Sequence, residues 1–220
     1  MRPKLDWRAV QTGGALCLAY ACAAAVPTTA PGDTHGTTPI AATAKVAVSD
    51  RRLNVRMGRR AVVRGVIQPP GITVALQIRR GHRWVTLDRD RADARGAYVL
   101  RDRVHRPLSA HARVKVVAGA AGSRRIGRLN VYRHALASWY GPGLYGGHLS
   151  CGGRLGYSKL GVAHKTLPCG TRVTLRHRGR VVRVPVIDRG PYSGAREYDL
   201  TAATARRLHF RGHGPILTTR

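Results

Sequence analysis

The sequence predicts a mostly β protein that has two β domains in succession and one short helix near its C-terminal end. From about residue 45 onward, short runs of alternating apolar and polar residues recur between turns that contain Gly and Pro, a pattern typical of strands with one buried face. Near residue 136 the composition shifts toward Gly and aromatic residues. The 220 residues are enough for two small domains, and we place the boundary at this shift.

Residues 1–26 have the three parts of an export signal. A positively charged start precedes an apolar stretch, residues 13–26, that is too short to span a membrane, and small residues around Ala25 offer a cleavage site. The alternative is a lipoprotein signal, in which Cys22 would be lipidated and attach the chain to a membrane, although Tyr20 fits that motif poorly. Both interpretations place the mature protein outside the cytoplasm, secreted or associated with the cell wall.

The chain is strongly basic, with 39 Lys and Arg against 10 Asp and Glu and a net charge of +29. Such a surface favours polyanions: nucleic acid, anionic lipid, or the phosphate and carboxylate polymers of a bacterial wall. The basic residues are spread along the chain without a block of consecutive Lys or Arg. Because export also removes the protein from nucleic acid, we expect anionic wall polymers as partners; simple compositional bias toward Arg is the alternative.

Between the signal and the composition shift we expect a linker and a first domain. Residues 27–44 are rich in Thr, Pro, Ala and Gly, which predicts a flexible linker. Residues 45–133 hold about seven short alternating runs, a spacing that predicts a β-sandwich of immunoglobulin-like architecture. This region lacks the Cys pair of antibody domains and shows no catalytic constellation, so we expect a spacer or a module that docks on the wall.

Two of the four cysteines, Cys151 and Cys169, remain once residues 1–26 are removed. Two cysteines in an exported domain most often pair, and closing a loop of this length would stabilise the fold by roughly 3 kcal/mol. The alternative is a metal site with His148 and His164, but such sites need four well-spaced ligands. The spacing matches no standard zinc pattern, so we predict a disulfide, no metal and no cofactor.

The second domain is expected to combine strands, one helix and Gly-rich loops. We predict strands at 136–140, 171–176 and 180–187, and a helix at 202–208 that Thr201 caps. Aromatic residues interleave with the Gly-rich loops, which suits a groove that stacks on the apolar faces of sugars.

Three motifs then follow one another in this domain. They are Ala-Ser-Trp-Tyr-Gly at 137–141, Val-Ala-His-Lys-Thr-Leu-Pro-Cys-Gly-Thr at 162–171, and Val-Ile-Asp-Arg-Gly-Pro-Tyr at 186–192. In this order and spacing they resemble the rare lipoprotein A (RlpA)-like family, and residues 198–203 fit that family's closing helix. The resemblance covers about residues 136–214 and implies a six-stranded double-psi β-barrel with a short helix, which we place at 136–220.

The family resemblance implies a protein that acts on peptidoglycan glycan strands. Active members of the family are lytic transglycosylases, which break the strand without water and leave a 1,6-anhydro sugar. Related barrels occur in expansins, which loosen plant walls without clear hydrolysis. The alternative to an enzyme is therefore a non-catalytic module that binds peptidoglycan or polysaccharide.

Three residues of the second domain are acidic: Asp188, Glu197 and Asp199. Breaking a glycosidic bond needs a proton donor at the leaving oxygen, and one carboxyl could act first as acid and then as base when the sugar's own hydroxyl closes the ring. Asp188 is the best candidate because it follows an apolar strand and precedes a tight turn; the alternative is that it caps that turn or pairs with an Arg. We expect Asp199 to favour the dipole of the following helix.

His164 is the predicted second catalytic residue, because it lies in the family motif and could hydrogen-bond Asp188 or orient the substrate. We further predict that Tyr140, Tyr145, Arg189 and Tyr192 bind substrate. Core packing would explain any one of the tyrosines equally well.

The sequence departs from the family pattern just before the His motif. Active members typically carry Glu and Asp in a Ser-Gly-Glu-Arg-Phe-Asp-like stretch, where this chain has Gly153 and Gly156. The loss of both carboxylates favours the binding module, whereas Asp188 and His164 favour chemistry.

Overall fold

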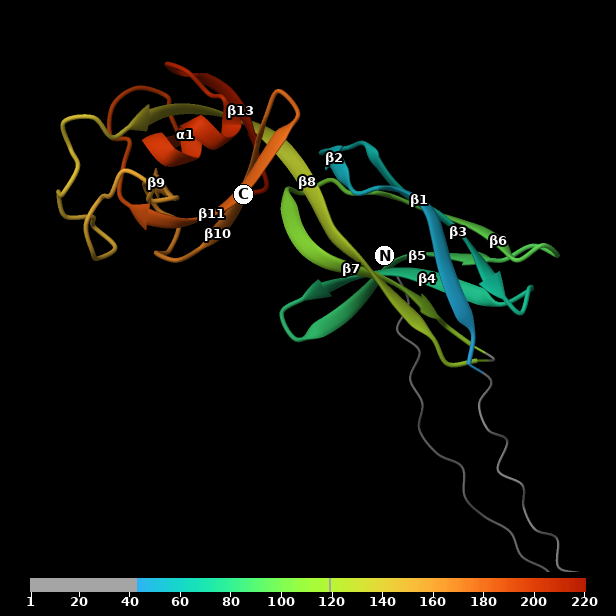
Figure 1. Cartoon of the computed structure of the whole chain (residues 1–220). Helices are drawn as coiled ribbons and strands as arrows, with labels where there is room; N and C mark the ends of the chain where they lie inside the picture. Colours follow the sequence, from blue (N-terminus) through green and yellow to red (C-terminus); the bar gives the residue numbers. More distant parts are fainter. Residues whose placement is uncertain (1–42, 119) are drawn as a thin grey trace, which may run out of the picture. The chain divides into compact units, whose positions relative to one another are not determined.

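The computed structural model describes residues 43–118 and 120–220, and Figure 1 shows how their strands and helix are arranged. The predicted signal peptide at 1–26, the lipidation alternative at Cys22 and nearly all of the predicted linker at 27–44 lie outside the described residues. Within the described ranges, no helix is long and apolar enough to cross a membrane.

The described residues form thirteen strands and one helix, which confirms the mostly β class. The first domain contains β1 (Lys45–Arg52), β2 (Asn54–Arg56), β3 (Arg60–Gln68), β4 (Thr73–Arg80), β5 (Arg83–Arg91), β6 (Ala97–Arg103), β7 (Leu108–Val116) and the first half of β8 (Ser123–Tyr140). The second half of β8 is followed by β9 (Val162–His164), β10 (Arg172–His177), β11 (Arg180–Asp188), β12 (Tyr198–Thr201), α1 (Ala202–Leu208) and β13 (Gly214–Thr218).

Two antiparallel sheets share one core in the first domain. One sheet has the order β1-β3-β6, and the other continues from β8 through β7 and β4 to β5, with β2 parallel to β8. Buried side chains of both sheets, such as Val63 and Leu100 on one and Leu76 and Val114 on the other, belong to a single hydrophobic cluster. Burial alternates along β3 as expected for a strand with one face on the core. The immunoglobulin-like assignment of this domain stays a prediction.

Strand β8 belongs to both domains. Its residues up to Tyr132 pair with β7 and β2, and from Arg133 onward they pair with β13 and β12. The boundary that we placed at 133–136 therefore falls inside one continuous strand.

Six strands close into a barrel in the second domain. The order is β12-β9-β11-β10-β13-β8, and β12 pairs with β8 as well as with β9, so that no edge is left open. Two pairings, β8 with β12 and β9 with β11, are parallel. Buried apolar residues such as Val162, Leu175, Val184, Leu200 and Ile216 fill the interior.

Helix α1 spans the predicted residues and begins at the predicted cap. The Thr201 hydroxyl accepts a hydrogen bond from the Thr204 backbone N–H, and His209 ends the helix in a left-handed conformation with φ of 49°. Ala205 and Leu208 of α1 belong to the core of the barrel, and the helix packs on β11, β12 and β8.

Candidate active site

Four neighbouring strands of the barrel place a row of side chains at one level. Ser138 on β8 pairs in register with Asp199 on β12, Asp199 pairs with Ala163 on β9, and Ala163 pairs with Asp188 on β11. Side chains of directly paired residues point to the same face of a sheet. Both aspartates therefore share one face, and only the small Ala163 lies between them.

Asp188 is the last residue of β11 and follows an irregularity in the β9–β11 register between Val186 and Asp188. Such bulges re-aim a side chain at the end of a strand. The Oδ1 atom of Asp188 accepts hydrogen bonds from the backbone N–H groups of Ser150 and Arg189, both at 2.9 Å. Its Oδ2 atom has no hydrogen-bond partner among the residues that the structure describes, so one carboxylate oxygen is left for a ligand.

Asp199 is held from the opposite side of Ala163. The Ser138 hydroxyl donates a hydrogen bond to Asp199 Oδ1 at 2.8 Å, and the Arg196 guanidinium donates one to the Ser138 oxygen at 3.0 Å. Burial raises the pKa of Asp199 above its ordinary value of 3.8; the Ser138 hydrogen bond and Arg196 lower it, and the charge of Asp188 raises it. The net shift is upward, which favours the protonated acid.

Tyr140 brings a hydroxyl to the two carboxylates. Its ring packs on a small cluster formed by Leu149, Leu155 and Ile187. The hydroxyl is buried without a partner of proper hydrogen-bond geometry among the described residues, and it lies close to Asp188. Burial raises the pKa of Tyr140, and the negative charges of Asp188 and Asp199 raise it further. Tyr140 thus places a buried hydroxyl beside Asp188.

The predicted disulfide is confirmed. Cys151 and Cys169 are bonded, with their Cα atoms 5.6 Å apart, so neither thiolate is free to bind a metal with His148 or His164. The bond ties the loop before the His motif to the turn after it. Through the Ser150 N–H, this loop also contacts Asp188.

Arg189, which we expected to bind substrate, lies in the same assembly of loops. Its guanidinium donates hydrogen bonds to the carbonyl of Leu167 at 2.8 Å, to that of His164 at 3.3 Å, and to the Cys169 sulfur at 3.2 Å. These contacts hold the turn after His164 against the end of β11.

The ring of His164 is hydrogen-bonded to the turn that follows it. Its Nδ1 atom accepts hydrogen bonds from the backbone N–H groups of Thr166 and Leu167, both at 3.1 Å, so the neutral ring carries its proton on Nε2. Burial lowers the pKa of His164; Glu197 raises it, and Arg133, Arg189 and Lys165 lower it. The neutral form is therefore favoured.

The structure does not join His164 to Asp188. His164 follows Ala163, so strand alternation turns its side chain to the other face, where its ring meets the edge of Tyr198 with centroids 5.0 Å apart. No hydrogen bond between His164 and Asp188 occurs among the residues described. The catalytic pairing of these two residues stays a prediction, whereas the geometry brings Asp199 and Tyr140 to Asp188.

The third carboxylate of the barrel is already paired with a guanidinium group. Glu197 accepts two hydrogen bonds from the Arg133 guanidinium, at 2.9 and 2.5 Å. The Arg133 hydrogen bond is the main cause that lowers the pKa of Glu197, and burial opposes it. Glu197 therefore stays ionised and has no proton to donate.

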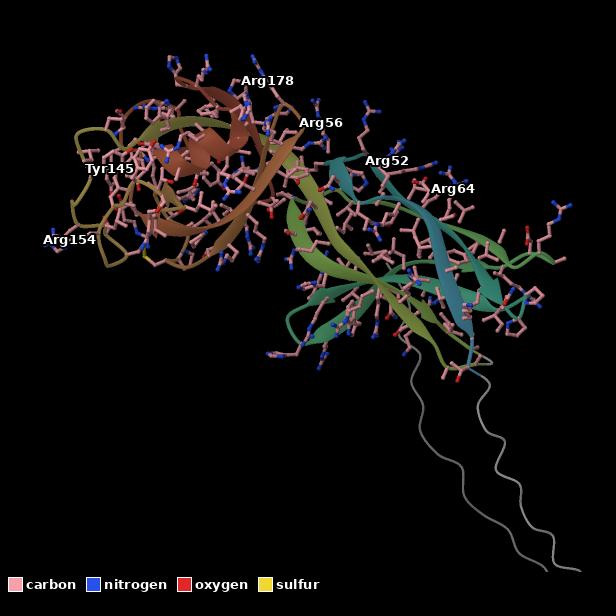
Figure 2. The ribbon with its side chains drawn as sticks, viewed as in Figure 1. Arg52, Arg56, Arg64, Tyr145, Arg154 and Arg178 are labelled. Atoms are coloured by element: carbon pink, nitrogen blue, oxygen red, sulfur yellow. A yellow bond between two sulfur atoms is a disulfide. The ribbon has the colours of Figure 1, made fainter. Side chains whose placement is uncertain are left out.

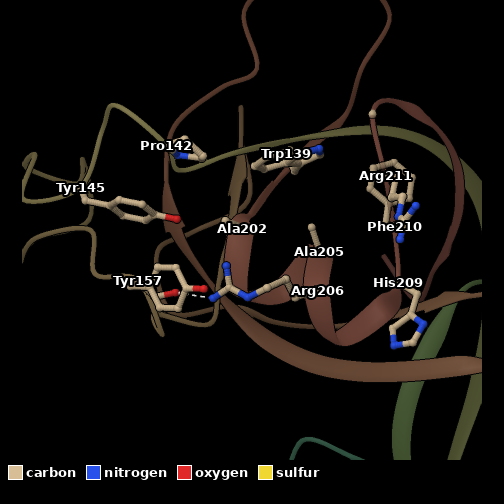
Figure 3. Close-up of a pocket in the computed structure, with 11 residues that line it drawn as sticks. Trp139, Pro142, Tyr145, Tyr157, Ala202, Ala205, Arg206, His209, Phe210 and Arg211 are labelled. Atoms are coloured by element: carbon tan, nitrogen blue, oxygen red, sulfur yellow. Dashed lines mark hydrogen bonds between the residues drawn. The ribbon is translucent and has the colours of Figure 1, made fainter.

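An aromatic groove of about 750 Å³ lies beside α1 (Figure 3). Trp139, Tyr145, Tyr157 and Phe210 line it, and the Arg206 guanidinium stacks on the Tyr157 ring at 4.1 Å. Tyr145, one of the predicted substrate-binding residues, lies here with its ring centroid 5.8 Å from that of Tyr157. None of the three carboxylates lines this groove.

Tyr192, the remaining residue predicted to bind substrate, is 78% exposed in the loop after β11. It does not line the aromatic groove. Its assignment stays a prediction.

Asp199 is the site residue that sequence reasoning passed over. It was assigned to the dipole of α1, yet it lies on β12 and contacts Ser138. The alternation of Tyr198, Asp199 and Leu200, with the apolar residues fully buried and Asp199 between them, is the signal that could have found it.

The second half of the chain matches known proteins. Residues 133–217 match a family model described as lytic transglycolase. A probable endolytic peptidoglycan transglycosylase RlpA from Synechocystis is 40% identical over 105 residues, which are 47% of this chain and 31% of that protein. The counterpart from Aquifex aeolicus is 35% identical over 46% of each chain, and an endolytic peptidoglycan transglycosylase RlpA from Campylobacter jejuni is 41% identical over 36% of this chain and 30% of its own. The chain thus spans less than half the length of these relatives.

Among solved structures, the Streptomyces papain inhibitor is similar over 40% of this chain and 90% of its own, with 26% sequence identity and a TM-score of 0.33.

Proposed function

Because the barrel domain of this chain belongs to the RlpA-like double-psi β-barrel family, we propose that the protein is an extracytoplasmic lytic transglycosylase that cleaves the glycan strand of peptidoglycan to a 1,6-anhydro product. The observation that carries this proposal is the pair of aspartates on one face of the barrel, separated by Ala163. Glycosidases use a pair of carboxyl groups in different protonation states, and this pair is held in different environments.

In the proposed reaction Asp199 is the acid. Its raised pKa supports a proton that passes to the glycosidic oxygen, whereupon the bond from the anomeric carbon to that oxygen breaks and its electron pair stays on the oxygen. The C6 hydroxyl of the same sugar then bonds to the anomeric carbon and gives its proton to the Asp199 carboxylate. Asp199 is restored, and no water is consumed.

Asp188 has the complementary role. Its two backbone N–H donors fix the carboxylate, and its free Oδ2 would face the positive charge that develops at the anomeric carbon. The Tyr140 hydroxyl would donate to the substrate or to Asp188 as the sugar enters. His164, proposed from the motif as a second catalytic residue, acts here as a positioning residue that holds the turn which Arg189 clamps.

This assignment agrees with the two missing carboxylates of the loop. Gly153 has φ of 78°, in the left-handed region that favours glycine, and a Cβ atom built on Gly156 meets nothing within 4 Å. A side chain at 153 would strain the loop that the disulfide holds. The proposed chemistry therefore rests on acids that the barrel strands themselves supply.

One experiment separates this enzyme from a binding module. The full-length exported protein is incubated with peptidoglycan stripped of its stem peptides, and the soluble products are analysed by mass. We expect oligosaccharides that end in a 1,6-anhydro sugar from the wild type and none from Asp188→Asn. Sedimentation with the wall but no product from the wild type, at equal protein dose, would rule out the enzyme.

The aromatic groove supports the second candidate, a non-catalytic module that holds polysaccharide. Trp139, Tyr145 and Tyr157 are each more than a third exposed, and exposed aromatic rings suit the apolar faces of sugars. Under this alternative Trp139→Ala would weaken sedimentation with the wall, while Asp188→Asn and Asp199→Asn would leave it unchanged. The first domain would serve in either case as a spacer or a wall-docking module.

A further inference from the structure

The first domain carries a concentration of positive charge that glycan cleavage does not use. A concave surface of about 920 Å³ is formed where the end of β1, β2, the turn after it, β3 and β6 meet. No acidic residue lines it. Six arginines do: Arg52, Arg56, Arg59, Arg60, Arg101 and Arg103. All six are exposed. Figure 2 labels Arg52 and Arg56, whose side chains project away from the ribbon.

The register of the sheet forces these charges together. Arg60 on β3 is directly opposite Arg103 on β6, and Val62 is flanked by Arg101 on β6 and Arg52 on β1. Paired residues and residues two apart along a strand share a face, so these side chains lie on one outer surface. Like charges directly opposite each other destabilise a sheet. The arrangement therefore has a cost to the fold when nothing is bound.

Elsewhere on the same sheet a carboxylate offsets the charge. Arg64 is paired in register with Asp50, and their side chains form an ion pair at 3.0 Å. Within residues 43–118 and 120–220, the guanidinium groups of the six groove arginines make no ion pair or side-chain hydrogen bond. Their donors are left to solvent and to a ligand.

We propose that this arginine groove is a binding site for a linear, phosphate-bearing polymer of the cell envelope. Guanidinium groups bind phosphate oxygens through paired hydrogen bonds, and several of them along a groove suit an anion that repeats its charge. Binding would also relieve the repulsion between Arg60 and Arg103. The site is independent of the proposed glycan cleavage, because every residue that lines it belongs to the first domain.

The lining favours a polymer without bases over a nucleic acid. Proteins that bind single strands combine a basic groove with aromatic side chains on which bases stack. No aromatic residue lines this groove, and the apolar side chains between the arginines are Val55, Met57 and Val62. The same chain carries a barrel of a family that acts on peptidoglycan, so an envelope polymer is the polyanion that its location would offer.

The test compares two pairs of arginines that are matched in charge and in register. Arg60 and Arg103 are opposite each other in the groove, and Arg80 and Arg83 are opposite each other beside the β4–β5 turn. Affinity for fluorescent poly(glycerol phosphate) is measured at several salt concentrations for the full chain, for Arg60→Gln with Arg103→Gln, and for Arg80→Gln with Arg83→Gln. Polyglutamate and single-stranded DNA of equal charge are the comparison probes, and thermal unfolding checks each variant.

We expect the groove variant to bind poly(glycerol phosphate) about tenfold more weakly and to lose about two units of salt slope, with a melting temperature no lower than that of the wild type. The β4–β5 variant should bind as the wild type does. Equal losses of affinity in both variants would show that the polymer binds through overall charge and not at a defined site. No loss of affinity in either variant would show that the groove is not the binding surface. Tighter binding of DNA or polyglutamate than of poly(glycerol phosphate) would overturn the proposed ligand. Because glycan cleavage is measured separately, none of these outcomes depends on it.

Discussion

The two aspartates of the barrel differ in how they are held, and this difference defines their proposed roles. Asp188 receives two backbone N–H donors, whereas the half-buried Asp199 accepts a hydrogen bond from Ser138 and has a raised pKa. A carboxylate with fixed donors suits a developing positive charge, and a carboxyl with a raised pKa suits a proton donor. Glu197, which is paired with Arg133, has no proposed role in cleavage and is therefore the control carboxylate for both aspartates.

A substrate with a good leaving group tests Asp199 as the acid. A dinitrophenyl glycoside of the GlcNAc–MurNAc disaccharide needs little protonation when its bond breaks, so Asp199→Asn should release dinitrophenol at close to the wild-type rate. On glycan strands the same variant should lose at least about 100-fold, the usual contribution of an acid. Asp188→Asn should be slow on both substrates. Equal losses on both substrates for Asp199→Asn would contradict its role as proton donor.

The raised pKa of Asp199 also predicts a stability effect of definite sign. The folded chain retains a proton on Asp199 that the unfolded chain releases above pH 3.8, so this contribution to stability is complete below that pH. It is lost as the pH rises through the folded-state pKa. Asp199→Asn should therefore gain stability relative to the wild type between acidic and neutral pH, as measured by thermal unfolding.

Glu197→Gln is the control for this measurement, because the pKa of Glu197 is shifted in the opposite direction and its effect on stability should have the opposite sign. The lowered pKa of Glu197 means that its contribution is present above its ordinary value of 4.5 and is lost as the pH falls through the folded-state pKa. The variant should be less stable than the wild type at neutral pH. A difference between Asp199→Asn and wild type that does not change with pH would contradict the raised pKa.

Two replacements of His164 separate positioning from chemistry. An asparagine at this position would place its Oδ1 near the position of Nδ1 and keep an acceptor for the N–H groups of Thr166 and Leu167, whereas a glutamine would extend toward the position of Nε2 and leave them unpaired. We expect His164→Gln to lower the free energy of unfolding by about 1 kcal/mol and His164→Asn to lower it clearly less. Cleavage should likewise be slower in His164→Gln than in His164→Asn. Higher activity in His164→Gln than in His164→Asn would point instead to a direct role for Nε2.

At the scale of elements, the disulfide couples the loop before β9 to the site. Cys151 and Cys169 are 18 residues apart, and Ser150 donates directly to Asp188. Replacing both cysteines by Ser should lower the free energy of unfolding by roughly 3 kcal/mol in denaturant titrations. Glycan cleavage should fall further than wall sedimentation does, because Asp188 loses a fixed donor. Unchanged cleavage in the folded variant would show that the loop does not organise Asp188.

The elements themselves were largely readable from sequence. Alternating runs predicted β10 and β11, and Thr201 marked the start of α1 at its observed position. The contiguous motifs predicted the barrel, because they specify strands and turns together. The cysteine pair was predictable because few alternatives remained once two cysteines were assigned to the signal.

The site was harder to predict because it is made across strands. Ser138, Ala163, Asp188 and Asp199 meet through the register of β8, β9, β11 and β12, which local patterns do not encode. His164 and Asp188 lie in adjacent motifs, yet strand alternation turns His164 away from the face on which Asp188 lies. Motif membership alone therefore suggested a pairing, and the barrel topology brings another acid to Asp188.

At the scale of the whole molecule, the two domains divide the work that we propose for it. The barrel holds the carboxylates and the aromatic groove, and the first domain holds the arginine groove. Strand β8 is common to both. The net charge of +29 thus includes one groove that six arginines and no acidic residue line.

The mass of the reaction products in heavy-oxygen water distinguishes ring closure by the sugar's own hydroxyl from hydrolysis. If Asp188 and Asp199 drive ring closure by the sugar's own hydroxyl, wild-type protein acting on peptidoglycan will release 1,6-anhydro ends that carry no heavy oxygen. The yield should fall to background in Asp188→Asn and stay at the wild-type level in Arg60→Gln with Arg103→Gln. Reducing ends that contain heavy oxygen, or an undiminished anhydro yield from Asp188→Asn, would contradict ring closure driven by these two aspartates.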